Sequence, residues 1–185
     1  MKLLNYYRQA LLLLAATFSF WSCSSEPEYV DPEAHERTIQ LNEKYAPLMV
    51  GTWYYENTND THRFFERMTF KADSTFTGMR KWQVRKLVTI DGKERYTDWE
   101  SIESLEGTFT GTWSLRYWSP DGNEKRDYLQ LLASFDNNTE WNYMAYSSNV
   151  AFDYANATTL CFRGIYYNDD GGWAHYQRGD AEPSF

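Results

Sequence analysis

Few residues of this chain have the types and spacing that catalysis or metal binding requires. The three histidines, at positions 35, 62 and 175, are far apart and lack the spacing of metal-ligand pairs. No HExxH, GxSxG, Walker or CxxC pattern occurs. Glutamates at 100, 103 and 106 predict a solvated acidic stripe on one helical turn, since the EF-hand spacing is absent. We therefore expect no enzyme, no metal and no cofactor, although the many carboxylates leave a catalytic pair open as an alternative.

An N-terminal leader comes first in the chain. Lys2 and Arg8 give residues 1–22 a basic start, and an apolar run follows at 11–20. A run of that length is too short for an ordinary transmembrane helix of about 20 apolar residues. A serine and Cys23 then place a small residue before a cysteine, and a polar, acidic stretch follows.

This arrangement resembles the signal peptide of bacterial lipoproteins, although Phe20 and Trp21 stand where that family commonly has leucine and a small residue. The resemblance implies cleavage before Cys23, acylation of that cysteine with chains such as palmitate, and a lipidated tether over 23–32. It also implies display in the outer membrane, at the surface of a Gram-negative bacterium. An ordinary secretory peptide cut nearby and an uncleaved anchor are the alternatives.

The second cysteine has a different expected role. Cys161 stands in the strand-like run TTLCFRG, and with Cys23 acylated it is the single remaining thiol, so no intramolecular disulfide can form. No neighbouring pattern supplies the base that a cysteine nucleophile needs. We expect a buried, inert thiol.

The composition favours one acidic, aromatic-rich domain. The 185 residues suffice for one ordinary domain, and removal of Lys2 and Arg8 with the leader lowers the net charge from −8 to −10. Nucleic acid is not an expected partner, because phosphate binding needs clusters of lysine and arginine. The 8 Trp, 15 Tyr and 11 Phe are expected mainly in the core, and the same rings offer flat faces to ligands.

A short helix is predicted before the first strand. Asp31 is expected as its N-cap and Pro32 at its first position, and Pro47 is expected to end it. The residues at 34, 38, 41, 45 and 48 recur at helical spacing. We expect this helix to cover one end of the structure that follows.

Strand-like segments joined mostly by short turns fill the rest of the chain. The tripeptide Gly-Thr-Trp opens two series of them, at 51–53 and 111–113. A looser polar segment is expected at 147–157. Side-chain alternation and turn residues predict strands at 51–57, 64–72, 75–85, 87–90, 93–97, 108–118, 128–135, 141–146, 158–167 and 173–178.

The order of these segments predicts an all-β fold, an up-and-down antiparallel barrel of about eight strands over 33–180. Short turns make consecutive strands antiparallel neighbours, and a long sheet removes its edges by closing. Glu66 and Arg80 fall on faces that also carry aromatic residues. We expect them either to pair across strands inside the lumen or to lie near an open end. Residues 181–185 are expected as a flexible tail.

Over roughly residues 33–178 the chain is similar to the lipocalin (calycin) superfamily. Gly51 and Trp53, after a short helix, resemble the family's first G-x-W motif. The run MTFKADSTFTG at 68–78 and the second GTW resemble the lipocalin-like domains of exported bacterial lipoproteins.

The resemblance implies that Trp53 closes one end of the barrel, with an arginine from late in the chain packed over its ring. Arg163 and Arg178 are the candidates. The chain departs from the family in lacking a clear C-terminal helix and the family's disulfides. The family's ligand-carrying function is therefore implied only as one option, because a fold does not determine a function.

The first expected function is a binding module, a membrane-anchored lipoprotein that holds a small hydrophobic or aromatic-stacking ligand in its barrel. The same rings could instead fill a closed core. The candidate pocket residues are Trp82, Trp113, Tyr117, Trp141 and Tyr143.

The alternative is a surface interaction protein with a filled barrel, whose loops bind a protein or glycan partner. Trp99, Trp118 and Trp173, which lie near predicted turns, would then make the contacts. Ser74 is a further candidate site, because Asp-Ser-Thr at 73–75 resembles the D-S/T-x acceptor for O-glycosylation in one group of Gram-negative anaerobes. The sequence predicts neither the ligand nor the oligomeric state.

Overall fold

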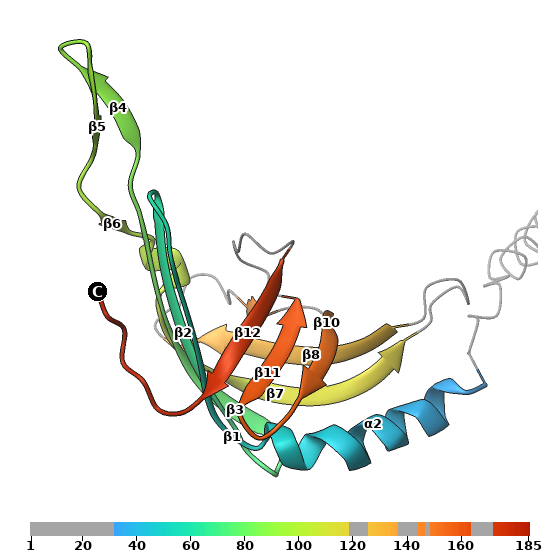
Figure 1. Cartoon of the computed structure of the whole chain (residues 1–185). Coiled ribbons are helices and arrows are strands. Elements are labelled where there is room, and N and C mark those ends of the chain that lie inside the picture. Colours follow the sequence, from blue (N-terminus) through green and yellow to red (C-terminus); the bar gives the residue numbers. More distant parts are fainter. Residues whose placement is uncertain (1–31, 119–125, 137–143, 147–148, 164–171) are drawn as a thin grey trace, which may run out of the picture. The chain divides into compact units, whose positions relative to one another are not determined.

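The computed structural model describes residues 32–118, 126–136, 144–146, 149–163 and 172–185. Asp31–Phe185 is one compact unit. The described residues of this unit contain one α-helix, α2 (Ala34–Met49), and are otherwise mostly antiparallel strands (Figure 1).

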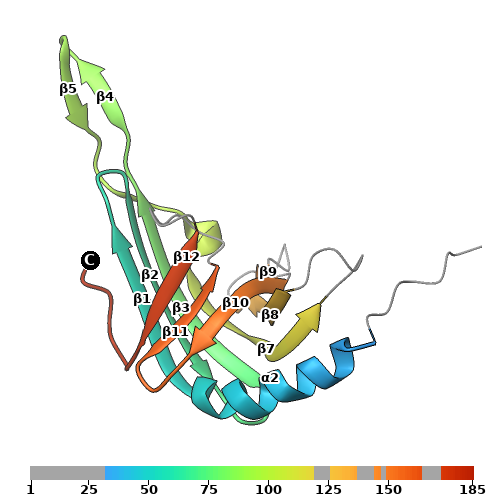
Figure 2. The ribbon, with the colours of Figure 1, turned by 45° about the vertical axis from the view of Figure 1, so that its right-hand side comes forward.

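Eight of these strands close into a barrel, as the sequence predicted (Figures 1 and 2). Strand β8 pairs with its chain neighbour β7 and also with β10, and the second pairing closes the ring. In order around the barrel the strands are β10 (Asn149–Ala155), β11 (Thr159–Arg163), β12 (Trp173–Arg178), β1 (Gly51–Thr58), β2 (His62–Phe70), β3 (Thr75–Val84), β7 (Gly107–Trp118) and β8 (Arg126–Phe135).

The remaining elements are short. Strand β9 (Met144–Tyr146) pairs with β8, and β6 (Glu100–Ser101) pairs with β3 next to the 3-10 turn η1 (Glu103–Leu105). Strands β4 (Leu87–Ile90) and β5 (Lys93–Tyr96) form a separate two-stranded sheet. We call residues 85–97, which contain this hairpin, the arm. Figure 1 shows the arm continuing beyond the end of β3.

The barrel has two ends, which we name by what lies there. At the Trp53 end, β1 begins, and the turns at 71–74 and 156–158 connect strands. At the arm end, β1 turns into β2 at 59–61, and β3 leads into the arm.

Strand β10 occupies a segment for which the sequence predicted only a looser polar stretch. Val150 and Phe152 are buried, but the pairing with β11 shifts between Phe152 and Tyr154. A bulge of this kind adds a residue and breaks the strict alternation of faces. Ala155 is therefore buried in place of Tyr154, and the period-2 pattern that identifies a strand is lost.

Helix α2 runs two residues beyond Pro47, so the expectation that this proline ends the helix was wrong. Proline lacks the N–H that would donate to Glu43 O, so α2 continues past Pro47 with one helical hydrogen bond missing. The final turn is closed instead by Val50 N, which donates to Ala46 O at 3.3 Å. At the other end Glu33, not Asp31, occupies the N-cap position.

The helix covers an exposed edge of β7. Strand β3 pairs with β7 only up to the Thr75–Thr112 pair, which leaves later residues of β7 without a strand on that side. Asn42 Nδ2 donates to Leu115 O at 2.8 Å, and Tyr117 N donates to Thr38 Oγ1 at 3.1 Å. Helix side chains thus satisfy backbone groups that would otherwise form an open edge.

Aromatic and branched side chains from the inward faces form a single core. Neighbouring rings meet edge-on or stacked, for example Phe162 on Tyr176 with centroids 4.8 Å apart. Core members from the barrel strands include Trp53, Met68, Phe70, Phe76, Phe109, Trp113, Leu129, Leu131, Phe152 and Leu160.

The C-terminal segment, expected as a flexible tail, lies against the outer face of the barrel. Phe65 points outward from β2 yet is fully buried, and its cross-strand neighbours are Glu56 and Lys81. Ser184 hydrogen-bonds to Glu56, and Lys81 Nζ donates to Phe185 O at 3.3 Å. Residues 184–185 therefore span Phe65, and this contact explains why an outward ring is shielded from water.

We predict that deletion of residues 180–185 lowers the free energy of unfolding by about 2 kcal/mol, because the Phe65 ring becomes exposed. The salt bridges from Arg67 to Asp180 and Glu182 should add little, since these carboxylates are largely exposed. Urea denaturation measures the loss. In a Phe65→Ala background the same deletion should cost less than about 0.5 kcal/mol, and an equal loss in both backgrounds would refute the explanation.

Candidate functional site

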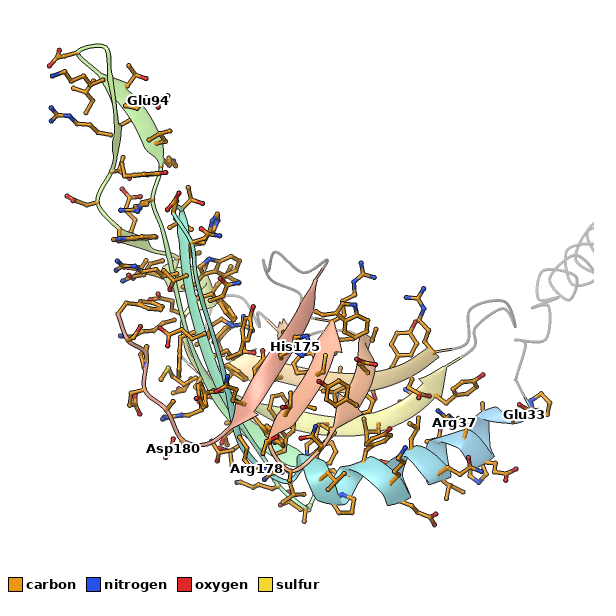
Figure 3. The ribbon with its side chains drawn as sticks, in the orientation of Figure 1. Glu33, Arg37, Glu94, His175, Arg178 and Asp180 are labelled. Carbon is orange, nitrogen blue, oxygen red and sulfur yellow. The ribbon has the colours of Figure 1, made fainter. Side chains whose placement is uncertain are left out.

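The Trp53 end is closed by an indole under a guanidinium, the arrangement that the resemblance implied. Trp53 is fully buried and donates from Nε1 to Met49 O at 2.7 Å. The Arg178 guanidinium carbon lies 4.2 Å from the centre of the indole ring. Figure 3 shows Arg178 at the end of β12, beside the end of α2. Arg163, the other candidate, has an exposed side chain and ends β11 at the arm end.

Arg178 also links three segments of this end through backbone oxygens. Its Nη1 donates to Val50 O at 3.0 Å, its Nε donates to Ala157 O at 2.8 Å, and its Nη2 donates to Leu48 O. Gly51 permits this approach, because a Cβ there would lie 2.4 Å from Nη1 and its φ is +135°. Gly51 and Trp53, the two defined residues of the G-x-W pattern, therefore both have a structural role here.

A buried charge network lies across the lumen. Glu66 and Arg80 pair directly on β2 and β3, and the Arg80 Nε donates to Glu66 Oε2 at 2.7 Å. The Tyr176 hydroxyl, from β12, donates to the other carboxylate oxygen at 2.5 Å. Both charged side chains are fully buried. Of the two placements that the sequence left open, pairing inside the lumen is confirmed.

Aromatic rings surround the Arg80 guanidinium. Its carbon lies 5.7 Å from the ring centre of Phe64, 5.6 Å from that of Phe109 and 5.5 Å from that of Phe135. These distances allow cation–π attraction, which is strongest where water is excluded. From the Trp53 end to this level the described inward side chains are buried and belong to one packed cluster.

We predict that Arg80→Met lowers the free energy of unfolding by about 3–5 kcal/mol, because it leaves the Glu66 carboxylate buried without its cation. The double variant Glu66→Gln, Arg80→Met removes both charges and keeps an acceptor for Tyr176. It should lie within about 1 kcal/mol of the natural protein in urea denaturation. A double variant as unstable as Arg80→Met would contradict this account.

The structure does not bring the predicted pocket residues together. Trp113 is buried at the Trp53 end, where its Nε1 donates to Lys71 O at 3.1 Å and Phe70 meets its ring edge-on. Trp82 is half-buried at the arm end, with its ring edge-on to Phe64. From the register of β3 and β7, eight residues separate the two rings, or roughly 26 Å along the strands.

The other three predicted pocket residues do not restore a common site. Tyr117 is half-buried beyond Trp113 on β7, near the start of α2. Trp141 and Tyr143 lie outside the described residues. Trp82, Trp113 and Tyr117 do share the inward face, as expected. Because the strands are long, however, residues on one face can lie at opposite ends of the barrel.

Half-buried polar and aromatic groups lie at the arm end of the lumen. Asn57 Nδ2 donates to the Tyr55 hydroxyl at 3.1 Å, and Trp82 is the next inward residue after Arg80 on β3. The Tyr55 ring lies 5.3 Å from that of Tyr176. We call Tyr55, Asn57 and Trp82 the mouth group.

The base of the arm is held by stacked cations and aromatic rings that sequence analysis missed. The Arg85 guanidinium carbon lies 4.2 Å from the ring centre of Tyr96 and 4.4 Å from that of Trp99. Arg63, on β2, lies 4.2 Å from the same Trp99 ring. The Arg85 Nε also donates to Asp60 O at 2.6 Å. These contacts attach the arm to the β1–β2 turn.

The arm itself exposes apolar side chains. Leu87 is 49% exposed, Ile90 51% and Tyr96 41%, so this short hairpin holds three of the six large hydrophobic residues that are exposed in the described chain. Figure 3 shows Glu94 on the arm, well away from the barrel strands. Trp99 is half-buried between arginines, and Trp173 is half-buried at the start of β12. Trp118, the third tryptophan predicted to make contacts, ends β7, and its side chain is not described.

The outer face of the barrel carries a groove of about 440 Å³ over β1, β2, β3 and β7. Threonine is the commonest residue in its lining, which also includes one arginine and two aspartates. Threonine is also a usual residue on the solvent face of strands, so the lining alone indicates no ligand. Its lining includes Thr52, Thr69, Thr77, Thr108, Thr110, Arg67, Asp136 and Asp180.

The acidic stripe predicted on one helical turn does not form, because only the second of its three glutamates lies in a helical turn. Glu100 lies in β6 and Glu103 in η1, and Glu106 Oε1 accepts a hydrogen bond from Trp82 N at 2.8 Å. The described residues contain no group of three or more histidine, cysteine or carboxylate side chains placed to hold a metal ion.

Cys161 is buried on β11, and its cross-strand neighbour is His175. The distance from Sγ to His175 Nε2 is 3.9 Å, a pairing that a separation of 14 residues hid from sequence analysis. Burial, with a smaller effect from Asp153, raises the pKa of the Cys161 thiol to about 12. The thiol therefore stays protonated at neutral pH, in keeping with an inert cysteine.

Ser74 is exposed in the turn between β2 and β3, where its φ is +65°. Asp73 accepts hydrogen bonds from the Thr75 hydroxyl and Thr75 N, and these bonds lower the pKa of the Asp73 carboxyl. The serine is accessible to a modifying enzyme, and its glycosylation stays a prediction.

Comparison with family models, curated proteins and solved structures found no match to this chain. Within the described residues no helix has the length and apolar character to cross a bilayer.

Proposed function

We propose that this chain is a lipid-anchored surface protein that binds a partner protein through its arm. The barrel serves as a rigid base, and Cys23 supplies the lipid. The observation that carries the proposal is the exposure of Leu87, Ile90 and Tyr96 on a hairpin whose base is firmly attached to the barrel.

Two physical arguments support a role in binding. An isolated two-stranded hairpin is marginally stable in water, so its attachment through Arg85 keeps in place an element that adds nothing to the barrel core. Clustered exposed apolar residues cost solubility unless a partner covers them. The lumen, by contrast, is filled by its own side chains from Trp53 to Arg80.

Site-specific photocrosslinking tests this function. A benzophenone amino acid at Ile90 in the full chain, displayed on intact cells, should give a discrete adduct with one partner. The matched control is Leu132, an exposed hydrophobic residue of the barrel that is 39% exposed. It should give no such adduct. Equal labelling from both positions, or labelling from Leu132 alone, would reject the arm as the binding element, and an adduct with a glycan would redirect the proposal to that partner.

A second function, binding of a small hydrophobic or aromatic-stacking ligand, is favoured by the mouth group. Tyr55, Asn57 and Trp82 combine rings with a polar amide at the arm end of the lumen, as ligand pockets commonly do. Such a ligand would occupy the mouth, because Trp113 is buried in the core at the other end.

Mass spectrometry of the protein isolated from its native membrane tests the anchor, the modification and this ligand together. We predict a chain that begins at Cys23 and carries acyl groups, and a Cys23→Ala variant that is released from the membrane. Hexose additions that disappear in Ser74→Ala would establish glycosylation. An unacylated N-terminus would refute the anchor. A native spectrum without any bound small molecule would argue against the mouth group as a ligand site.

A further inference from the structure

The two edges of the arm differ in chemistry. Strand β4 reads Leu-Val-Thr-Ile and has no charged residue, whereas three of the four residues of β5, Lys-Glu-Arg-Tyr, are charged. Charged side chains on an edge strand oppose the addition of another strand, and an uncharged run rich in β-branched residues favours it. The arm is therefore protected along β5 and unprotected along β4.

The pairing of the arm determines which backbone groups face outward. Asp91 and Gly92 form a two-residue turn with φ values of 52° and 72°, so Ile90 and Lys93 make the first hydrogen-bonded pair. The bond from Thr97 N to Lys86 O fits the same alternation. Hydrogen-bonded and non-bonded pairs alternate in an antiparallel ladder.

It follows that the N–H and C=O groups of Leu87 and Thr89 point away from β5, toward the free edge of β4. On the other strand, those of Tyr96 and Glu94 point toward the free edge of β5. In the hairpin, Leu87 lies opposite Tyr96 and Thr89 lies opposite Glu94, and neither is a hydrogen-bonded pair. An added strand would meet two donors and two acceptors on β4.

We propose that the outer edge of β4 binds an extended segment of a partner protein as an added strand. This inference rests on the proposed function of the arm and specifies how it binds. Backbone hydrogen bonds to Leu87 and Thr89 give the affinity, and the side chains on the two faces of the hairpin select the sequence.

The side chains of the arm indicate the chemistry of that segment. Val88 and Ile90 share one face with their partners Arg95 and Lys93, and Leu87 shares the other face with Tyr96. Residues 85–97 carry a net charge of +2 in a chain of net charge −8. The fitting segment alternates acidic residues, on the face of the sheet that carries Arg95 and Lys93, with apolar residues, on the face that carries Leu87 and Tyr96.

A membrane surface fits the arm less well. Membrane-binding elements separate apolar from polar residues by face, whereas here the separation is by strand, with apolar β4 beside charged β5. Insertion of β4 edge-on would bury its outward N–H and C=O groups without partners, at a cost of several kcal/mol for each group. An added strand satisfies the same groups.

A second copy of this chain also fits less well. Two copies of net charge −8 repel each other, and four residues of edge provide far less contact than the ~1,000 Å² that a stable dimer buries. An acidic segment of a different protein meets the positive arm without bringing the acidic barrels together.

Fluorescence anisotropy with a defined probe tests the proposal. The probe is a labelled eight-residue peptide of alternating valine and glutamate, added to the full chain in lipid nanodiscs. We expect saturable binding that weakens at least tenfold in Thr89→Pro, which removes an outward N–H and no bond to β5. Glu94→Pro, the equivalent change on the edge of β5, should keep the affinity within twofold. A valine–lysine peptide should bind at least tenfold more weakly.

Hydrogen exchange on the same samples locates the contact. The probe should slow exchange of the Leu87 and Thr89 amides at least tenfold and leave Glu94 and Tyr96 unchanged. Absence of saturable binding, or binding that survives Thr89→Pro, would overturn the proposal. Protection of Leu87 that grows with protein concentration without probe would assign the edge to a second copy and overturn it too. If Ile90 still crosslinks to its partner in the Thr89→Pro protein, the arm binds by another mode, so the proposed function stands and strand addition fails.

Discussion

The hydrogen-bonded ion pair of Glu66 and Arg80 is the interaction that the barrel's register depends on. Two charges that are removed from water must be paired and fully hydrogen-bonded, or each costs several kcal/mol. Cross-strand pairing of β2 and β3 supplies the first contact, and Tyr176 supplies another from β12, on the far side of β1. A slip of one residue in either pairing would turn a charged side chain out of the lumen and separate the network. We therefore attribute to this pair a role in specifying register more than in adding stability, which is why single and double substitutions should differ so strongly.

Filling of the barrel follows from the same constraint. The rings around Arg80 exclude water and strengthen its pairing, and Trp53 under Arg178 completes the packing at the far end. A lumen occupied in this way cannot also hold a large ligand at the same level. The surfaces that stay accessible to a binding partner are the outside of the barrel and its arm end, where the mouth group and the arm lie.

Features that depend on local sequence patterns, such as strands and turns, could be predicted from the sequence. Contacts between segments far apart in the chain could not. Period-2 alternation and turn residues correctly indicated most strands and the arm hairpin, whereas a bulge after Phe152 hid β10. The pairing of Glu66 with Arg80 could be foreseen only as one of two placements, because register decides between them. The expected pocket failed for a similar reason, since a shared face does not place Trp82 near Trp113. Contacts such as the tail over Phe65 leave no local signal at all.

The arm differs from the rest of the fold in how its strand edges are protected against pairing with another strand. Closure between β8 and β10 removes the edges of the main sheet, and the side chains of α2 satisfy the uncovered part of β7. The charged side chains of β5 oppose the addition of another strand, which is a third kind of edge protection. Strand β4 has none of these protections, although replacing Thr89 with lysine would supply one without disturbing any bond of the hairpin. An edge that is exposed, uncharged and held in place by Arg85 is a liability for a protein that only needs to stay soluble. It is an advantage for one that must accept a strand from a partner.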